Sequence, residues 1–375
     1  NDQLENRPQP YHYCCGVRNA QQKAACAALI GVMMQTEISK RDLASTFSIQ
    51  RIGKFIGKNY LLFSLILLIV AGTLVNDAFL STANLKGLLF TVAIYGLLAV
   101  GQSLNMLVSE LNLTLGASMA FSPILAIWIA RNIYAASGVE IVRSGVQLVG
   151  GVPLIVFLVL LISVLVGVTI GSIRVKFGVS SLIISLGMSY LLQGSSYIIS
   201  NSNLIYLSEI KNINWLGTAA IGPFPVSFLI FLLIGIVLIL LMKYTRFGLR
   251  LYSTGGNEKA AVYSGVNTKM WKIIALGISG FCAGLAALMY SSRMESIDPI
   301  QGEGLQFYAL SIAIIGGISV AGGKGSLSGT LMASAVLVII LNIMQIFGLA
   351  SWYQTIMIGA IILIASSQAI RKPAR

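Results

Sequence analysis

One carboxylate interrupts a long apolar stretch of this chain. Glu110 is the only charged residue among the 44 residues between Lys86 and Arg131. A carboxylate in such a setting is costly to keep and marks a functional position by default. Two interpretations are open from the sequence: residues 105–116 form a turn that exposes Glu110 to water, or they interrupt a helix so that freed backbone groups and polar side chains line a cavity.

A second polar feature is the long segment 243–272. Asn257 is a good N-cap residue, and Glu258 favours the first turn of a helix. Two alanines follow within that turn, and Gly265 can end the helix. We therefore expect a short amphiphilic surface helix that is suited to dock on a soluble partner. The alternative is an ordinary solvated loop.

The sequence offers little else for catalysis. The glycine-rich segment 316–325 does not fit a phosphate-binding loop, because position 318 is Ile, position 325 is Gly and no strand precedes it. His12 is the only histidine, and the four cysteines, three of them in the first 26 residues, show no CxxC spacing, so no metal site is predicted. A membrane-embedded hydrolase is disfavoured because no Ser/His/Asp combination falls in the apolar segments.

The elements that must position these residues are apolar segments. Of the 375 residues, 56% are hydrophobic and 10% are charged, whereas soluble domains carry about 25% charged residues. So few charges cannot cover a soluble protein of this size, but lipid can replace water around most of it. We predict an all-α polytopic membrane protein with about ten transmembrane helices. The expected spans are 59–76, 86–108, 112–131, 151–172, 178–198, 223–243, 271–291, 305–319, 326–347 and 352–370.

Glycines modify this simple pattern in two ways. The eighth span is short and ends near Gly316 and Gly317, so we expect it to be tilted, broken or partly re-entrant. Pairs of glycines four residues apart predict helix faces that pack closely. These pairs are Gly167 and Gly171, Gly280 and Gly284, and Gly325 and Gly329.

The positive charges indicate an orientation. The net charge is +13, and the 25 lysines and arginines lie in the gaps between apolar runs rather than in one cluster interleaved with aromatic residues, which argues against nucleic-acid binding. With ten spans and a cytoplasmic N-terminus, 20 of the 25 fall on the cytoplasmic side, as the positive-inside rule requires. We therefore expect both termini in the cytoplasm.

The chain divides into two parts. Residues 1–45 form a polar N-terminal tail that is expected to be disordered or non-native, since its one apolar run is too short to span a membrane. Residues 46–375 form the transmembrane domain, with a cytoplasmic loop at 244–270 that carries the expected surface helix.

These residues resemble a known family. Glu258, Lys259, Ala260 and Ala261, followed by Gly265, are similar to the EAA-type coupling motif of bacterial ATP-binding-cassette (ABC) importer permeases. The surrounding blocks look like the monosaccharide branch, the ribose, xylose and galactose type, over roughly residues 56–370. The matching blocks are Arg246-Phe-Gly-Leu-Arg250, Gly255-Gly-Asn-Glu258, Ser264-Gly-Val-Asn267, Ile314 to Gly325, Gly329-Thr330, Trp352-Tyr-Gln354 and Val179 to Met188.

The resemblance implies a type II ABC importer permease in the bacterial inner membrane. Such a subunit is not an enzyme and binds no cofactor itself, since ATP and Mg bind to the partner ATPase. It pairs with a second permease copy or a sister permease, couples to two cytoplasmic ATPases, and receives a monosaccharide or similar small solute from a periplasmic or extracellular binding protein. The alternative is an autonomous ion-coupled carrier. Glu110 alone supports proton coupling only weakly, whereas a sodium-coupled carrier could use backbone carbonyls instead.

Polar residues within the spans are the candidates for a substrate pathway, although they could instead bind helices to one another. The family commonly has Gly-Gly-Ile-Asp-Leu-Ser-Val-Gly where this chain has residues 109–116, so Asn112 replaces an acid and Glu110 introduces one. Loops 201–222 and 292–306, with Glu209, Glu295, Asp298 and Glu303, are the expected docking surface for the binding protein. The pathway candidates are Gln102, Asn105, Ser109, Glu110, Asn112, Thr114, Ser118, Ser185, Tyr190 and Gln193.

Overall fold

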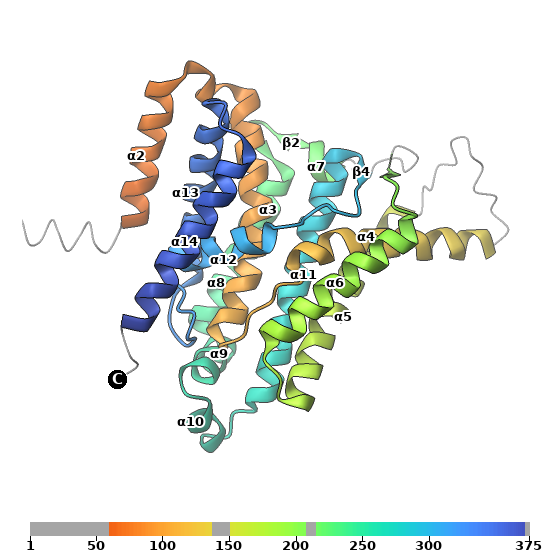
Figure 1. The fold of residues 1–375 in the computed structure, drawn as a ribbon, viewed down its shortest axis with the longest axis vertical. Helices are drawn as coiled ribbons and strands as arrows, with labels where there is room; N and C mark the ends of the chain where they lie inside the picture. Colours follow the sequence, from red (N-terminus) through yellow and green to blue (C-terminus); the bar gives the residue numbers. More distant parts are fainter. Residues whose placement is uncertain (1–59, 137–150, 208–214, 372–375) are drawn as a thin grey trace, which may run out of the picture. The chain divides into compact units, whose positions relative to one another are not determined.

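The computed structural model describes residues 60–136, 151–207 and 215–371, and it is almost entirely helical (Figure 1). The chain separates into the units Asn1–Phe63 and Ser64–Arg375, and everything below concerns the second. The predicted tail 1–45 lies outside the described residues. The main helices are α2 (Tyr60–Val75), α3 (Thr82–Leu107), α4 (Leu115–Ala136), α5 (Gly151–Phe177), α6 (Ser181–Ser200), α8 (Val226–Tyr244), α9 (Arg246–Gly256), α10 (Glu258–Tyr263), α11 (Thr268–Met294), α12 (Leu305–Ile315), α13 (Leu327–Ile346) and α14 (Ser351–Arg371).

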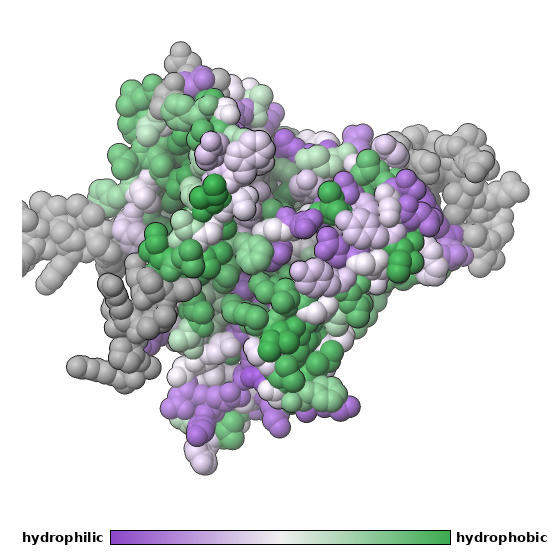
Figure 2. All heavy atoms as spheres, viewed as in Figure 1, coloured by the Kyte–Doolittle hydropathy of each residue, from purple (hydrophilic) through white to green (hydrophobic). Residues whose placement is uncertain are grey.

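Helices coincide with the predicted apolar segments. Six of those in the described residues are long and apolar enough to cross a membrane, namely α3, α5, α6, α8, α11 and α13. Figure 2 shows the corresponding surface: hydrophobic residues are spread over much of the visible face with hydrophilic residues among them, and hydrophilic residues gather at the lower end, where α9 and α10 lie. The prediction of an all-helical membrane protein is therefore confirmed, with six candidate spans and several shorter apolar helices.

Helix α12 has only 11 residues, which at 1.5 Å per residue is about 16 Å and too short to cross about 30 Å of hydrocarbon. Its C-cap is Gly316, and Gly317 has a positive φ of 85°, which glycine adopts at little cost. The short eighth segment that ends at these two glycines is therefore confirmed.

Helices α3 and α11 form the interior of the described structure. Helix α3 is continuously buried from Gly96 to Leu107, so it has no lipid-facing stripe along that length. Helix α11 packs against both α3 and α5. Its buried side chains between Ala275 and Ala287 are mostly small, which lets the neighbouring backbones come close. Cys282 lies in this stretch and is fully buried, as a small apolar side chain would be.

Two of the predicted glycine pairs face each other across the α5–α11 contact. A Cβ at Gly167 would collide with the carbonyl oxygen of Leu276, and a Cβ at Gly280 would collide with that of Ser163. The third pair was predicted wrongly, because Gly325 precedes α13 and has a φ of 129°, so it shares no helix face with Gly329. Gly329 instead packs against the carbonyl oxygen of Gly316.

Short strands join the two loops expected to lie outside. Strand β1 (Ile205–Tyr206) pairs antiparallel with β4 (Ser296–Ile297), which brings loop 201–222 against loop 292–306. Strands β2 (Ala220–Ile221) and β3 (Phe224–Pro225) form a second antiparallel pair, next to the short helix α7 (Trp215–Thr218). Both pairs lie at the end of α11 opposite to α9 and α10. Glu209, predicted for the docking surface, falls outside the described residues.

We expect Gly280→Ala to lower the unfolding temperature of the purified protein in detergent, since the new methyl group meets backbone atoms of α5 that cannot move aside. Overpacking of this kind costs about 1–3 kcal/mol. Gly187→Ala is the matched control because a Cβ there meets nothing within 4 Å. The interlocked contact would be refuted by equal unfolding temperatures for the two variants.

Candidate functional site

Helix α3 ends in a turn that uses a serine where glycine is usual. Ser109 has a φ of 61°, its backbone N–H donates to the Met106 carbonyl, and the N–H of Glu110 donates to the Asn105 carbonyl. This is the hydrogen-bond pattern of a Schellman motif, whose left-handed position is normally glycine. Ser109 adopts this less favourable backbone conformation, and its hydroxyl group makes two hydrogen bonds there.

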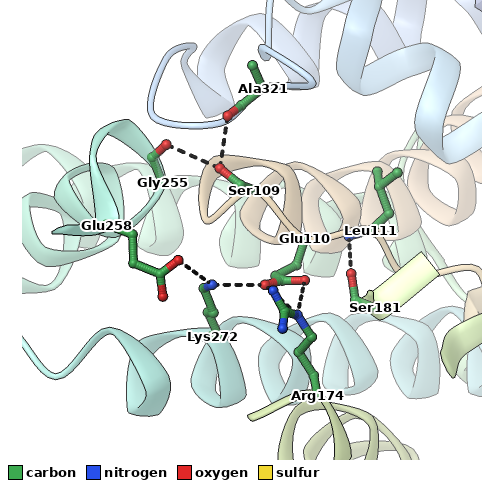
Figure 3. A network of polar contacts seen from close by, with 9 residues as sticks. All are labelled: Ser109, Glu110, Leu111, Arg174, Ser181, Gly255, Glu258, Lys272 and Ala321. Atoms are coloured by element: carbon green, nitrogen blue, oxygen red, sulfur yellow. Dashed lines mark hydrogen bonds and ion pairs between the residues drawn. The ribbon is translucent and has the colours of Figure 1, made fainter. Parts of the chain in front are cut away.

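The Ser109 hydroxyl group connects three segments. It lies 3.1 Å from the Gly255 carbonyl oxygen at the end of α9 and 2.9 Å from the Ala321 carbonyl oxygen in the 316–325 loop (Figure 3). Glycines allow this close approach, because a Cβ at Gly255 would collide with the Leu107 carbonyl oxygen. The glycine-rich loop 316–325 packs equally closely, because a Cβ at Gly323 would collide with the backbone of Gly256.

Glu110 lies beside Ser109 and is buried between two cations. Nε of Arg174, in the last turn of α5, is 3.1 Å from both carboxylate oxygens. Nζ of Lys272, in the first turns of α11, is 3.1 Å from Oε1. The Glu110 side chain is 3% exposed, and burying a carboxylate is costly unless cations pair with it and donate hydrogen bonds to it.

Lys272 is shared between two carboxylates. Its Nζ also lies 2.9 Å from Oε2 of Glu258, the first residue of α10, while its own side chain is 7% exposed (Figure 3). One ammonium group therefore connects the surface helix α10 to the end of α3. We call Ser109, Glu110, Arg174, Gly255, Glu258, Lys272 and Ala321 the polar junction.

The ionisation of Glu258 follows from this contact. Partial burial by itself would raise the pKa of Glu258, but the hydrogen bond and charge of Lys272, with smaller contributions from Thr268 and Arg174, lower its pKa below the ordinary value. Because the pKa of Glu258 is lower in the folded state, its ion pair with Lys272 stabilises the fold at pH values above the pKa of the unfolded state. This stabilisation is lost as the pH falls through the pKa of the folded state. Glu258 is therefore ionised at neutral pH.

Helix α10 has the expected caps. The Asn257 side chain accepts a hydrogen bond of 3.0 Å from the backbone N–H of Ala260, and Gly265 has a φ of 78°. Ala261 is buried against the protein, whereas Lys259 and Ala260 are exposed. The prediction of a short helix in this loop is confirmed in its structure.

The outer face of this region carries exposed apolar side chains. Tyr263 is 91% exposed, and Val262 on α10, Leu249 on α9 and Met270 on α11 are each more than half exposed. Large apolar groups on the surface of a polar, lysine-bearing helix pair are typical of a protein contact.

Residues 108–114 form a non-helical connection from α3 to α4 that is largely buried, with Ser109 exposed. Side chains satisfy its backbone: the Ser181 hydroxyl accepts from the Leu111 N–H at 3.0 Å, and the Ser189 hydroxyl donates to the Leu113 carbonyl at 2.9 Å. Irregular backbone at membrane depth survives only with such partners. The exposed-turn interpretation of Glu110 is therefore wrong, and an interrupted helical region is found.

Four further pathway candidates lie in the interior. Asn105 and Asn112 both donate to the Ser279 hydroxyl of α11, at 2.8 and 3.2 Å, so they connect helices. Asn112 also accepts hydrogen bonds from the backbone and hydroxyl groups of Thr114. Gln102 is fully buried, and neither of its amide atoms has a hydrogen-bond partner in the described part of the chain.

The other four pathway candidates predicted from the sequence do not lie together with these residues. Ser118 is buried in α4, and Ser185 is buried in α6 with its hydroxyl bonded to the Leu182 carbonyl of its own helix. Tyr190 lies on the outer face of α6 and is 71% exposed. Gln193 lines a small cavity of about 40 Å³ with Ser189, Gln301, Glu303 and Gln306. The structure therefore does not bring all ten candidates to one site.

Sequence reasoning missed Arg174, Lys272 and Ser279 as site residues. Arg174 and Lys272 entered only as charges that indicate orientation, and Ser279 carried no signal because serines are common in such spans. The one available clue was Glu110 itself, since a buried carboxylate requires a cation. The sequence does not say which of the 25 basic residues supplies it.

Comparisons with known proteins agree with one another. Residues 84–366 match the model of a family described as branched-chain amino acid transport system / permease component. The D-allose transport system permease protein AlsC of Escherichia coli is 30% identical over 80% of this chain and 87% of its own length. The ribose import permease protein RbsC of Haemophilus influenzae is 28% identical over 84% and 94%. The L-arabinose ABC transporter permease protein AraH of Azospirillum brasilense is 28% identical over 76% and 80%. No solved structure matches the chain.

We expect Lys272→Met to destabilise the protein by about 3 kcal/mol, because the buried Glu110 carboxylate then loses one of its two cationic partners. Adding Glu110→Gln should cost less than the sum of the single changes, since the uncompensated charge is gone. Denaturation in detergent measures all three variants. Lys269→Met, an exposed lysine on the same helix, is the control, and strictly additive losses would contradict the pairing.

Proposed function

Since this chain belongs to the family of branched-chain amino acid transport system permease components, we propose that it imports a monosaccharide or a similar small polyhydroxylated solute. It is a multi-pass membrane permease component of an ABC transporter and not itself an enzyme. The substrate class rests on the relatives, which are named for D-allose, ribose and L-arabinose. Their shared chemistry is a small neutral ring with several hydroxyl groups.

The proposed topology is that of a type II importer with ten spans and both termini in the cytoplasm. This topology assigns the end of the protein that carries α9 and α10 to the cytoplasm. Two lines support it: most lysines and arginines then lie inside, and a helix occurs at each of the ten predicted segments. The bacterial inner membrane is the corresponding location.

The observation that carries the proposal is the contact of α10 with the interior through Lys272. In this proposal a cytoplasmic ATPase binds the exposed face of α10 and α9, where Val262, Tyr263 and Leu249 protrude. ATP and Mg bind to that partner. A displacement of α10 then changes the distance between Glu258 and Lys272, and hence the balance of charge around Glu110.

This arrangement converts movement at the surface into movement of spanning helices. Lys272 belongs to α11, Arg174 to α5, and Glu110 to the connection between α3 and α4. Ser109 adds contacts to the end of α9 and to the loop before α13. A shift of α10 is therefore shared by several helices at once, which is the requirement for alternating access by rigid elements.

The other partners follow from the same proposal. A periplasmic or extracellular sugar-binding protein docks at loops 201–222 and 292–306, which β1 and β4 hold together. A second permease copy or a sister permease completes the transmembrane pair. Proton coupling by an autonomous carrier is not favoured, because the buried carboxylate of Glu110 is held between two cations.

The test uses proteoliposomes that contain the chain with its ATPase and binding protein. We expect ATP-dependent uptake of labelled D-ribose, D-allose or L-arabinose, and no uptake by the chain alone. Sugar uptake by the chain alone would contradict the proposal and favour the carrier.

Gly265→Ala is expected to lower ATP-dependent uptake about tenfold, because a left-handed backbone costs a side chain about 1–2 kcal/mol and shifts the end of α10. Gly265→Asn should retain most activity, since asparagine tolerates this conformation. Gly256→Ala is the matched control, as the nearest atom to its Cβ is 3.9 Å away. The comparison requires that all three variants reach normal levels in the membrane. Unchanged uptake by Gly265→Ala would refute a role in coupling for the turn at the end of α10.

Glu258→Gln is expected to uncouple transport, so that sugar uptake falls while the amount of permease in the membrane stays normal. The neutral amide keeps the shape of the side chain but loses the ion pair with Lys272. Transport-coupled ATP hydrolysis is the measurement, and an unchanged rate would contradict the proposed coupling.

A further inference from the structure

A cavity of about 380 Å³ lies at the end of the helix bundle opposite the polar junction. Its walls come from the first turns of α3 and α14 and from the last turns of α11 and α13. This volume falls in the range of about 300–1,000 Å³ that is usual for small-molecule sites. In the proposed topology this end faces away from the cytoplasm.

The lining of the cavity combines aromatic rings with groups that form hydrogen bonds, and no carboxylate occurs among its described lining residues. Amides and phenols can both donate and accept, which suits hydroxyl groups because these also do both. Aromatic rings offer flat apolar faces beside these polar groups. The main polar residues are Asn84, Tyr95, Tyr290, Arg293, Asn342 and Gln354.

Arg293 is the only charged residue among the described lining residues. Its guanidinium carbon lies 4.2 Å from the centre of the Phe90 ring, a stacking contact that fixes the direction of the side chain. No described carboxylate pairs with it. A guanidinium group has five N–H donors and no acceptor, so it can donate to oxygen atoms of a bound molecule.

Contacts between side chains hold the rest of the cavity wall in place. The amides of Asn84 on α3 and Asn342 on α13 donate to each other at 3.1 and 2.9 Å, which ties the two helices together at the cavity. The ring of Tyr95 packs against that of Tyr308 on α12, with centres 5.3 Å apart. Gln354 is only 7% exposed, and it lines the cavity from the first turn of α14. The cavity is therefore preformed and retains a buried amide for a ligand.

Polar residues continue from the cavity toward the polar junction. Tyr95 and Gln102 are seven residues apart, which places them on one face of α3, and Ser109 lies in the turn that follows the helix. Gln102 is fully buried with both amide atoms unpaired. A buried amide without a partner in this position fits a route along α3 on which a hydroxylated solute supplies the missing hydrogen bonds.

We propose that this cavity binds a neutral polyhydroxylated solute of monosaccharide size, with Arg293 and Gln354 as the main hydrogen-bonding groups. This inference rests on the proposed function, since it gives the imported sugar a site within one permease chain. The sugar hydroxyl groups accept from Arg293 and exchange hydrogen bonds with Gln354 and the phenols. Its ring carbons pack against the aromatic rings.

The test measures protection of a cysteine within the cavity. The full chain in lipid nanodiscs carries Thr91→Cys or, as a second reporter, Ala83→Cys, both of which are lining positions. Labelling by a thiol reagent is followed by mass spectrometry of the reporter peptide with D-ribose, D-allose or L-arabinose present. We expect at least one sugar to slow labelling about tenfold at ten times its dissociation constant, because only the empty cavity reacts.

Arg293→Met and Gln354→Leu should each abolish this protection, while Arg246→Met, an exposed arginine on α9, should keep it. Two variants are used so that a folding defect in one does not decide the result, and size-exclusion profiles check both. The inference is overturned when none of the three sugars protects the wild-type cavity. It is also overturned when inorganic phosphate or gluconate protects and the sugars do not, since the cavity would then bind anions.

The outcome is separable from that of the proposed function. If the complete transporter takes up sugar with ATP but no sugar protects either reporter cysteine, the cavity inference is refuted and the proposed import function stands. Protection by a sugar together with no ATP-dependent uptake would leave the cavity as a sugar site and contradict the proposed import function. A KM that rises in Arg293→Met with kcat unchanged would support a role in binding rather than in coupling.

Discussion

The arrangement depends on one buried ammonium group. Lys272 satisfies the buried carboxylate of Glu110 and at the same time holds the more exposed carboxylate of Glu258. At 3% exposure, the Glu110 carboxylate would be costly to bury without a cation beside it. Because both carboxylates bind the same ammonium group, the position of the surface helix α10 and the charge balance in the interior are physically linked.

Close backbone packing makes this link stiff. Glycines at 167 and 280 interlock α5 with α11, and those at 316 and 329 bring the end of α12 against α13. Helices that touch through their backbones move as units, since side-chain rearrangement cannot absorb a shift. In lipid, the hydrophobic effect does not drive helices together. Close contacts of this kind are therefore needed to hold the interior of a permease together.

The two polar regions of α3 lie at opposite ends of a buried helix. The end with Asn84 and Thr91 belongs to the cavity, and the end with Ser109 belongs to the polar junction. Buried polar groups in such a helix are costly unless they bond to protein or solute. Gln102, midway between them, is unpaired among the described residues, which makes α3 the element that joins the proposed binding and coupling functions.

The sequence by itself determined what depends on composition and local pattern. The scarcity of charge identified a membrane protein, the caps at Asn257 and Gly265 located α10, and paired glycines marked the end of α12. Tertiary structure decided which groups meet. Arg174 lies 64 residues from Glu110, and the cavity is built from four helices, so neither could follow from spacing along the chain. Such contacts depend on how side chains from distant helices pack, and a periodic pattern records only which face of each helix is buried.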